Sequence, residues 1–223
     1  MALQRWIFGL SSFAIGAVVI ALESDLRTAG DHSGYAPDQP IAYSHRLHAG
    51  ELQIACTYCH YGAQTSRHAG IPSATICMNC HKVVTAGFDA VLAERAAAEA
   101  EKREARPIES AELRKLYDAL ALDAKLEPIP GREPRAVPWQ RVHALPDFVY
   151  FDHRAHVTRG VACESCHGPV QAMERMRQDS TLSMGWCIAC HRASSTVAGT
   201  AAGAPDGPRV AEHVSTDCVS CHY

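Results

Sequence analysis

The sequence predicts a mainly α-helical fold with extensive loops and one N-terminal transmembrane helix. Three observations support this prediction. Residues 6–22 form an uncharged apolar run. Residues 88–127 are rich in the helix-forming residues Ala, Leu, Glu, Lys and Arg. Elsewhere, closely spaced cysteine pairs alternate with proline- and glycine-rich stretches, a pattern typical of short helices joined by long loops with almost no sheet.

All 10 cysteines of the 223-residue chain fall in five copies of one motif, CxxCH. We number the motifs one to five along the chain: they span residues 56–60, 77–81, 163–167, 187–191 and 218–222. Two thiols at this spacing can reach the two vinyl groups of one haem as thioethers, and the adjacent histidine then lies under the iron. The motif therefore predicts five covalently bound haem c groups, around which the helices and loops are built.

Each motif supplies two attachment residues and one proximal iron ligand. The predicted attachment residues are Cys56, Cys59, Cys77, Cys80, Cys163, Cys166, Cys187, Cys190, Cys218 and Cys221. The predicted proximal ligands are His60, His81, His167, His191 and His222. No other metal site and no catalytic residue is expected.

Three other interpretations of the cysteine pairs are weaker. A zinc site needs two such pairs or separate histidines, and a thioredoxin-like redox pair usually occurs once, beside a βαβ unit. A disulfide framework would show varied spacings, whereas here a histidine follows every pair. A nucleic-acid partner is disfavoured on separate grounds, because the formal net charge of −3 leaves no basic excess for phosphates.

A second repeated pattern, an aromatic residue and then HxxH, precedes the first and third motifs. Tyr43 opens the first copy and Phe151 opens the second. On a helical turn, HxxH places two imidazoles on neighbouring faces, where they can reach two different haems. The pattern predicts four of the five distal iron ligands, which are His45, His48, His153 and His156. The alternative is that one histidine of each pair is only a polar neighbour of a haem propionate.

The fifth distal ligand has several candidates. We expect His143, which stands just before the second aromatic–HxxH pattern. Met184 is the alternative, and it would raise the potential of its haem relative to bis-histidine neighbours. The remaining candidates are His32, His68 and His213.

The two repeated patterns together predict the domain organisation. Residues 41–82 and 148–192 are two copies of one diheme unit, each with HxxH followed by two motifs. The predicted divisions are a membrane anchor (1–27), a first diheme module (28–87), a helical insertion with a proline-rich linker (88–138), a second diheme module (139–193), and a loop with the C-terminal fifth haem (194–223). With about 45 residues for each haem, the porphyrins must supply much of the buried apolar surface.

The insertion itself predicts two helices. Residues 89–105 form an alanine-rich, charged helix that Pro107 ends, and we expect it to be a solvent-exposed arm. A second helix would bury one apolar face on the haem core or on a partner. That face comprises Leu113, Leu116, Tyr117, Leu120 and Ala124. Residues 128–138 and 194–208 are expected to be loops.

The apolar run at residues 6–22 is long enough, at roughly 26 Å as a helix, to cross a bilayer near the lower limit. A cleaved signal peptide is the alternative, with a poor cleavage site at Val19 and Ala21. We expect an uncleaved anchor with a cytoplasmic N-terminus, which Arg5 favours weakly. Because bacteria attach haem c outside the cytoplasm, the haem domain is expected on the periplasmic side of the inner membrane.

Beyond the haem motifs, the chain resembles the pentahaem c-type cytochrome subunit (ActA) of bacterial alternative complex III over nearly its whole length. The similar segments are residues 40–45 (PIAYSH), 56–60 (CTYCH), 69–73 (AGIPS), 77–82 (CMNCHK), 141–143 (RVH), 145–147 (LPD), 150–156 (YFDHRAH), 184–187 (MGWC) and 217–223 (DCVSCHY). The alanine-rich residues 89–105 have no clear counterpart in that family.

This resemblance implies an electron-transfer subunit, not an enzyme by itself, within a quinol:electron-acceptor oxidoreductase of a bacterial respiratory or photosynthetic chain. It implies an iron–sulfur subunit, a multi-span quinol-binding subunit and a monohaem cytochrome as partners. It also implies a periplasmic carrier or terminal oxidase as acceptor.

Two other functions compete with the electron-transfer subunit. One is a stand-alone, membrane-anchored multihaem quinol dehydrogenase that feeds periplasmic reductases. The other is a catalytic multihaem enzyme, which needs an open iron position, often marked by an attachment motif such as CxxCK. No such motif is present, and the histidines suffice to close every iron.

Overall fold

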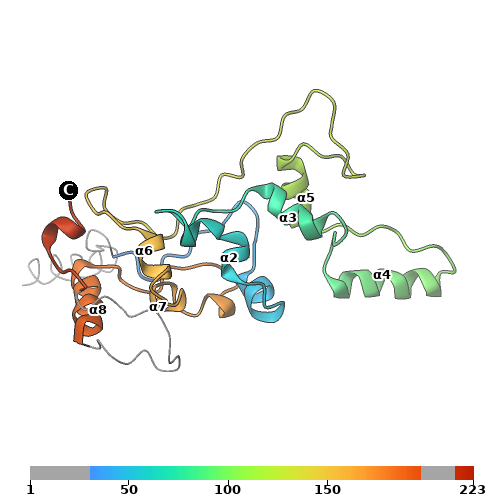
Figure 1. Ribbon diagram of the computed structural model, residues 1–223. Coiled ribbons are helices and arrows are strands. Elements are labelled where there is room, and N and C mark those ends of the chain that lie inside the picture. The colour runs from blue at the N-terminus through green and yellow to red at the C-terminus, as the bar shows by residue number, and fades with distance from the viewer. Residues whose placement is uncertain (1–30, 197–213) are drawn as a thin grey trace, which may run out of the picture. The chain divides into compact units, whose positions relative to one another are not determined.

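The computed structural model describes residues 31–196 and 214–223, and this part of the chain is mainly helical with long loops and no strand (Figure 1). The α-helices are α2 (Cys56–Cys59), α3 (Ala74–His81), α4 (Phe88–Ala100), α5 (Ala111–Ala119), α6 (His153–Val157), α7 (Glu164–His167) and α8 (Met184–Thr196). A π-helix, η1 (Arg46–Glu51), and three 3₁₀ turns, η2 (Tyr61–Gln64), η3 (Val170–Ala172) and η4 (Cys218–Ser220), complete the elements. The expected mainly helical, loop-rich fold is confirmed.

The chain divides into two compact units, each of which is described by itself. The larger unit comprises residues 35–142 and 151–177 and holds the first, second and third motifs. In the smaller unit, the described residues are 31–34, 143–150, 178–196 and 214–223, which hold the fourth and fifth motifs. The module boundaries predicted from the sequence remain a prediction.

Helix α5 in the larger unit packs against the helix that carries the second motif. Ser110 caps its N-terminus, where the hydroxyl accepts a hydrogen bond from the Glu112 backbone N–H. Leu116 and Tyr117 are buried, and the Tyr117 hydroxyl donates a 2.7 Å hydrogen bond to the His81 carbonyl. Helices α3 and α5 therefore lie side by side (Figure 1). Leu116 and Tyr117 of the predicted apolar face pack on the motif-bearing core, as expected, but α5 ends at Ala119, so Ala124 lies outside the helix and is exposed.

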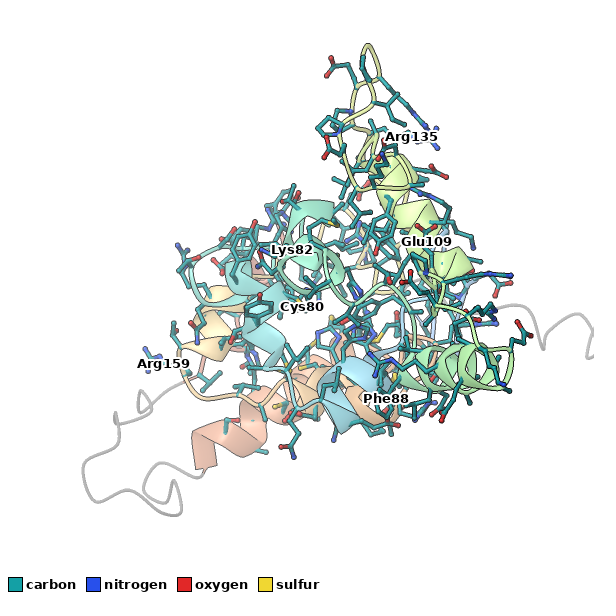
Figure 2. All side chains as sticks on the ribbon, turned by 90° about the vertical axis from the view of Figure 1, so that its right-hand side faces the viewer. Cys80, Lys82, Phe88, Glu109, Arg135 and Arg159 are labelled. Carbon is teal, nitrogen blue, oxygen red and sulfur yellow. The ribbon has the colours of Figure 1, made fainter. Side chains whose placement is uncertain are left out.

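Helix α4 is mostly solvent-exposed, as expected for the alanine-rich arm. Phe88, at its first turn, is 73% exposed and is labelled at the start of the helix in Figure 2. The helix ends at Ala100, before the predicted Ala105, because Lys102 adopts a left-handed φ of 53°. Arg103 then turns back to form an ion pair with Glu94.

The polypeptide contributes few large side chains to a core. Among the described residues, the buried apolar side chains larger than alanine are Leu116, Tyr117 and Met173. Many large apolar side chains are instead exposed, including Tyr58, Ile71 and Val84 near the first two motifs. A chain of this length normally buries more apolar surface, so the fold has room for bulky apolar groups beside the motifs.

Two segments predicted from the sequence lie wholly or partly outside the described residues. The membrane anchor predicted at residues 6–22 lies outside them, and none of the helices in 31–196 and 214–223 is long and apolar enough to cross a bilayer. The loop predicted from residue 194 begins later, because α8 continues to Thr196. The rest of that loop, from 197, lies outside the described residues.

Candidate haem-binding sites

The first HxxH pattern forms a tight turn whose imidazoles are held against one aromatic ring. The Tyr43 ring lies nearly parallel to the His48 ring, with 4.4 Å between centroids and 24° between planes. The same tyrosine meets the His45 ring edge-on, at 4.9 Å and 82°. The His48 Nδ1–H donates a 2.9 Å hydrogen bond to the Ser44 carbonyl. This bond fixes the ring and leaves its Nε2 available to a metal.

The second HxxH pattern, in α6, has the same geometry. Phe151 lies over His156 at 4.6 Å and 29°, and meets His153 edge-on at 4.9 Å and 85°. The His156 Nδ1–H donates to the Asp152 carbonyl at 2.9 Å. The Asp152 carboxylate caps the helix by accepting from the Arg154 backbone N–H. The repeated sequence pattern is therefore a repeated structural unit.

Three motif histidines are oriented in the same way by backbone carbonyls. The His60 Nδ1–H donates to the Gly70 carbonyl at 2.6 Å. The His81 Nδ1–H donates to the Val84 carbonyl, and the His191 Nδ1–H to the Ser215 carbonyl, both at 2.8 Å. A carbonyl oxygen only accepts hydrogen bonds, so each of these nitrogens carries the proton. The Nε2 atom of each ring is then the unprotonated one, which is the tautomer that iron ligation requires.

Two pairs of imidazoles lie at the separation that one metal ion would impose. A metal-bound imidazole nitrogen lies about 2 Å from the metal and ~1 Å from its ring centre, so two axial rings lie about 6 Å apart. His48 and His81 have centroids 6.1 Å apart, and His153 and His167 have centroids 6.3 Å apart. The residues present therefore fit a haem iron between a distal histidine from HxxH and a proximal histidine from CxxCH.

His45 and His60 make a third set in the larger unit. Burial lowers the pKa of His45 to about 4, and repulsion from His60, His48 and His167 contributes. The His45 Nδ1 is buried without a hydrogen-bond partner. Burial also lowers the pKa of His167, with contributions from His153 and His60. These buried rings are neutral at pH 7, which is the protonation state of an iron ligand.

None of the ten cysteines is joined in a disulfide, so all are available for haem attachment. Burial raises the pKa of Cys77, with Cys59 of the first motif contributing. Burial likewise raises the pKa of Cys163, with Cys56 of the first motif contributing. The first motif therefore lies close to both the second and the third. Figure 2 labels Cys80, in the last turn of α3, and Lys82, the residue that follows the helix.

The fifth motif in the smaller unit pairs with the segment that follows His143. Val149 forms an isolated antiparallel bridge with His222, and the Tyr150 N–H donates to the Cys221 carbonyl at 2.7 Å. The Tyr223 hydroxyl donates to the Asp147 carbonyl at 2.6 Å. His143 belongs to the same unit and is half-buried. The geometry is compatible with His143 as fifth distal ligand, which stays a prediction.

The other candidates for that ligand are placed differently. Met184 begins α8 in the smaller unit and is 65% exposed. His68 is exposed in the larger unit, whereas His32 is half-buried in the smaller one. His213 lies outside the described residues.

The sequence did not reveal the residues that orient the predicted ligands. Most are backbone carbonyls, such as those of Gly70, Val84 and Ser215, and a carbonyl carries no residue-type signal. Tyr117 was predicted only as a core residue, yet its hydroxyl binds the His81 carbonyl. Its place on the apolar face of α5 was the available signal.

The chain is similar in sequence to known multihaem cytochromes. Residues 149–223 match the family described as cytochrome c7 and related cytochrome c. Over 130 residues the chain is 31% identical to the multihaem cytochrome c subunit of menaquinone reductase from Nitratidesulfovibrio vulgaris (strain Hildenborough). This match covers 58% of the chain. The chain spans less than half, 46%, of that relative's length.

These similarities do not extend to the finer resemblance to alternative complex III. The family match covers the third, fourth and fifth motifs with the second HxxH pattern. Together with the repeated CxxCH motif, the two matches support a multihaem cytochrome c with covalently bound c-type haem, which acts in electron transfer.

Proposed function

We propose that this chain is an electron-transfer subunit that carries electrons through five c-type haems within a membrane quinol:electron-acceptor oxidoreductase similar to alternative complex III. The observation that carries this proposal is the spacing of the His48–His81 and His153–His167 rings, 6.1 and 6.3 Å. When bound, each haem supplies a reversible one-electron couple. At two of these sites, His48 with His81 and His153 with His167 would hold the iron between two imidazoles, which would favour electron transfer over binding of a substrate at iron.

The residues around the irons act by holding the ligands still. The aromatic ring of each HxxH turn fixes two imidazoles, and carbonyl acceptors such as Ser44 and Asp152 fix their tautomers. A ligand set that is rigid before and after reduction needs little rearrangement when the charge on iron changes. This rigidity suits electron transfer better than substrate chemistry.

The proposed partners follow from the sequence and from the relative. The relative's name makes it the cytochrome subunit of a menaquinone reductase, so a place beside quinone-reacting subunits is proposed for this chain too. The proposed partners are an iron–sulfur subunit, a multi-span quinol-binding subunit, a monohaem cytochrome, and a periplasmic carrier or terminal oxidase. The apolar residues 6–22 support anchoring in the bacterial inner membrane, with the haem domain on the periplasmic side.

Purification from native membranes tests this assignment. The chain, tagged and isolated in mild detergent, should bring with it an iron–sulfur protein and a multi-span membrane protein in fixed proportion. A second preparation washed in high salt controls for electrostatic adsorption, which salt screens. Isolation of the chain alone, with full quinol dehydrogenase activity, would refute the subunit assignment and establish the stand-alone quinol dehydrogenase.

A further inference from the structure

We propose that each of the two HxxH turns is positioned by the loop that follows a CxxCH motif of the other module. We call this reciprocal contact the exchange. It makes the first and third haem sites a coupled pair. The inference rests on the proposed function, since it assumes that haem is attached at these motifs. It adds an order in space that differs from the order in sequence.

Matching backbone hydrogen bonds show the exchange. The N–H of Arg46, which follows His45, donates to the Met173 carbonyl at 2.9 Å. The N–H of Arg154, which follows His153, donates to the Ser66 carbonyl at 3.3 Å. Met173 lies six residues after the third-motif histidine, and Ser66 lies six residues after the first-motif histidine. The two modules thus make the same contact on each other.

Side chains strengthen both halves of the exchange. In one half, the Glu174 carboxylate accepts hydrogen bonds from the Ser44 hydroxyl at 2.8 Å and from the Arg46 guanidinium at 2.9 Å. In the other half, the Arg67 carbonyl accepts from the His153 Nδ1–H at 3.0 Å, and the Arg67 guanidinium donates to the Phe151 carbonyl at 3.2 Å. Each HxxH turn is therefore held by two consecutive residues of the other module.

Gly50 lies where the backbones of the two modules approach each other closely. It lies in η1, which packs on η3, just as α6 packs on η2. A Cβ atom at Gly50 would lie 2.3 Å from the Gln171 carbonyl oxygen. No side chain fits there unless the two backbones separate. We assign Gly50 as a positioning residue for the exchanged turns.

The exchange brings the first and third sites together. Helix α6 packs on η2, and the Arg154 N–H donates to the Ser66 carbonyl, so the second HxxH turn lies beside the first motif. The Asn79 side-chain amide donates a 2.9 Å hydrogen bond to the Tyr58 hydroxyl, which joins the second motif to the first. The spatial order in the larger unit is therefore second, first, third. Two irons in adjacent sites should interact magnetically, and charge on one should oppose a like charge on the other.

Electron paramagnetic resonance of the oxidised, full-length protein tests the coupling. Pyridine haemochrome analysis first counts the attached haem, so absence of haem would refute the proposed function and not only this inference. In haem-loaded protein, we expect the low-spin signals of the first and third sites to be among those broadened by mutual coupling. Signals from independent haems that account for the whole haem content would overturn the inference and leave the proposed function standing.

A matched pair of glycine variants tests the exchange. Gly50→Ala should change the shape of the coupled signal while haem content stays unchanged. Gly87→Ala is the control, because a Cβ there meets no atom within 4 Å, and it should leave the signal unaltered. Equal spectra for the two variants would refute the positioning role of Gly50.

A milder variant guards against failure of Gly50→Ala to fold. Glu174→Gln keeps the shape of the side chain but weakens its charge-assisted bonds to Ser44 and Arg46. It should change the coupled signal in the same direction as Gly50→Ala, by a smaller amount. An unchanged signal in Glu174→Gln would also count against the exchange.

Discussion

The two HxxH turns are near copies of each other in geometry but not in support. In both, one aromatic ring lies over the second histidine and meets the first edge-on, with centroid distances that agree within about 0.2 Å. In both, the second histidine donates to the carbonyl four residues before it, at 2.9 Å. The shared aromatic–HxxH sequence thus specifies the arrangement of the imidazoles, whatever surrounds them.

The supports differ at the first histidine of each turn. The His153 Nδ1–H donates to the Arg67 carbonyl, whereas the His45 Nδ1 is buried without a partner. The helix type also differs, since Asp152 caps an α-helix and the first turn continues into a π-helix. The comparison teaches that local sequence sets ligand orientation, while contacts with the other module distinguish the individual sites.

Removal of a distal histidine should have the largest effect. Alanine at His45, His48, His153 or His156 should each convert one low-spin haem to a high-spin haem, because an axial position loses its imidazole. Optical and magnetic resonance spectra of the four variants measure this directly. His68→Ala is the control, and its exposed ring should be dispensable. A high-spin haem in His68→Ala would make His68, and not His143, the fifth distal ligand. The absence of a high-spin haem in any of the four variants would break the equivalence of the turns.

Removal of the aromatic rings should destabilise both turns about equally. Phe151→Ala and Tyr43→Ala each remove a ring packed on two imidazoles, which should cost about 2 kcal/mol and lower Tm by about 5 °C. Differential scanning calorimetry measures the shift. Tyr43→Phe is the control, because the second turn already has phenylalanine at this position. A shift in only one module would show that the shared pattern is not the common support.

Ring-plane angles should distinguish the second and third haem sites spectroscopically. The His153 and His167 planes differ by 8°, whereas the His48 and His81 planes differ by 59°. Near-parallel imidazoles split the iron d orbitals unequally and give a rhombic signal, and tilted ones raise the largest g value. Variants at His48 and His153 assign the two signals. The opposite assignment would contradict the ligand pairs.

A substitution in the α4 arm, which has no counterpart in the second module, should have the smallest effect on stability and none on the haem spectra. The Arg103 guanidinium lowers the pKa of Glu94 from 4.5 to about 2. The resulting stabilisation is complete above pH 4.5 and is lost as the pH falls toward 2. Glu94→Gln should therefore lower Tm slightly at pH 7, and the difference from the parent should shrink below pH 4.5. Thermal unfolding across this range measures it, and altered haem spectra would contradict an isolated arm.

The sequence singled out candidate ligands but not their surroundings. Motif spacing pointed to His60, His81 and the HxxH histidines, because covalent attachment and helical periodicity restrict which residues can serve, and their role as iron ligands stays a prediction. The helical face through Leu116 and Tyr117 was also correctly predicted, since its apolar spacing is local. The contact of Gly50 with Gln171 could not be foreseen. It joins segments far apart in the sequence through backbone atoms, which any residue possesses.

The central claim, that every CxxCH motif holds a haem, is tested most directly by the mass of the intact polypeptide purified from its own membranes. The account predicts a mass that exceeds the polypeptide by five haem groups and survives acid extraction, because thioether bonds are covalent. A mass without added haem, or one that reveals bound zinc in native spray, would contradict the account.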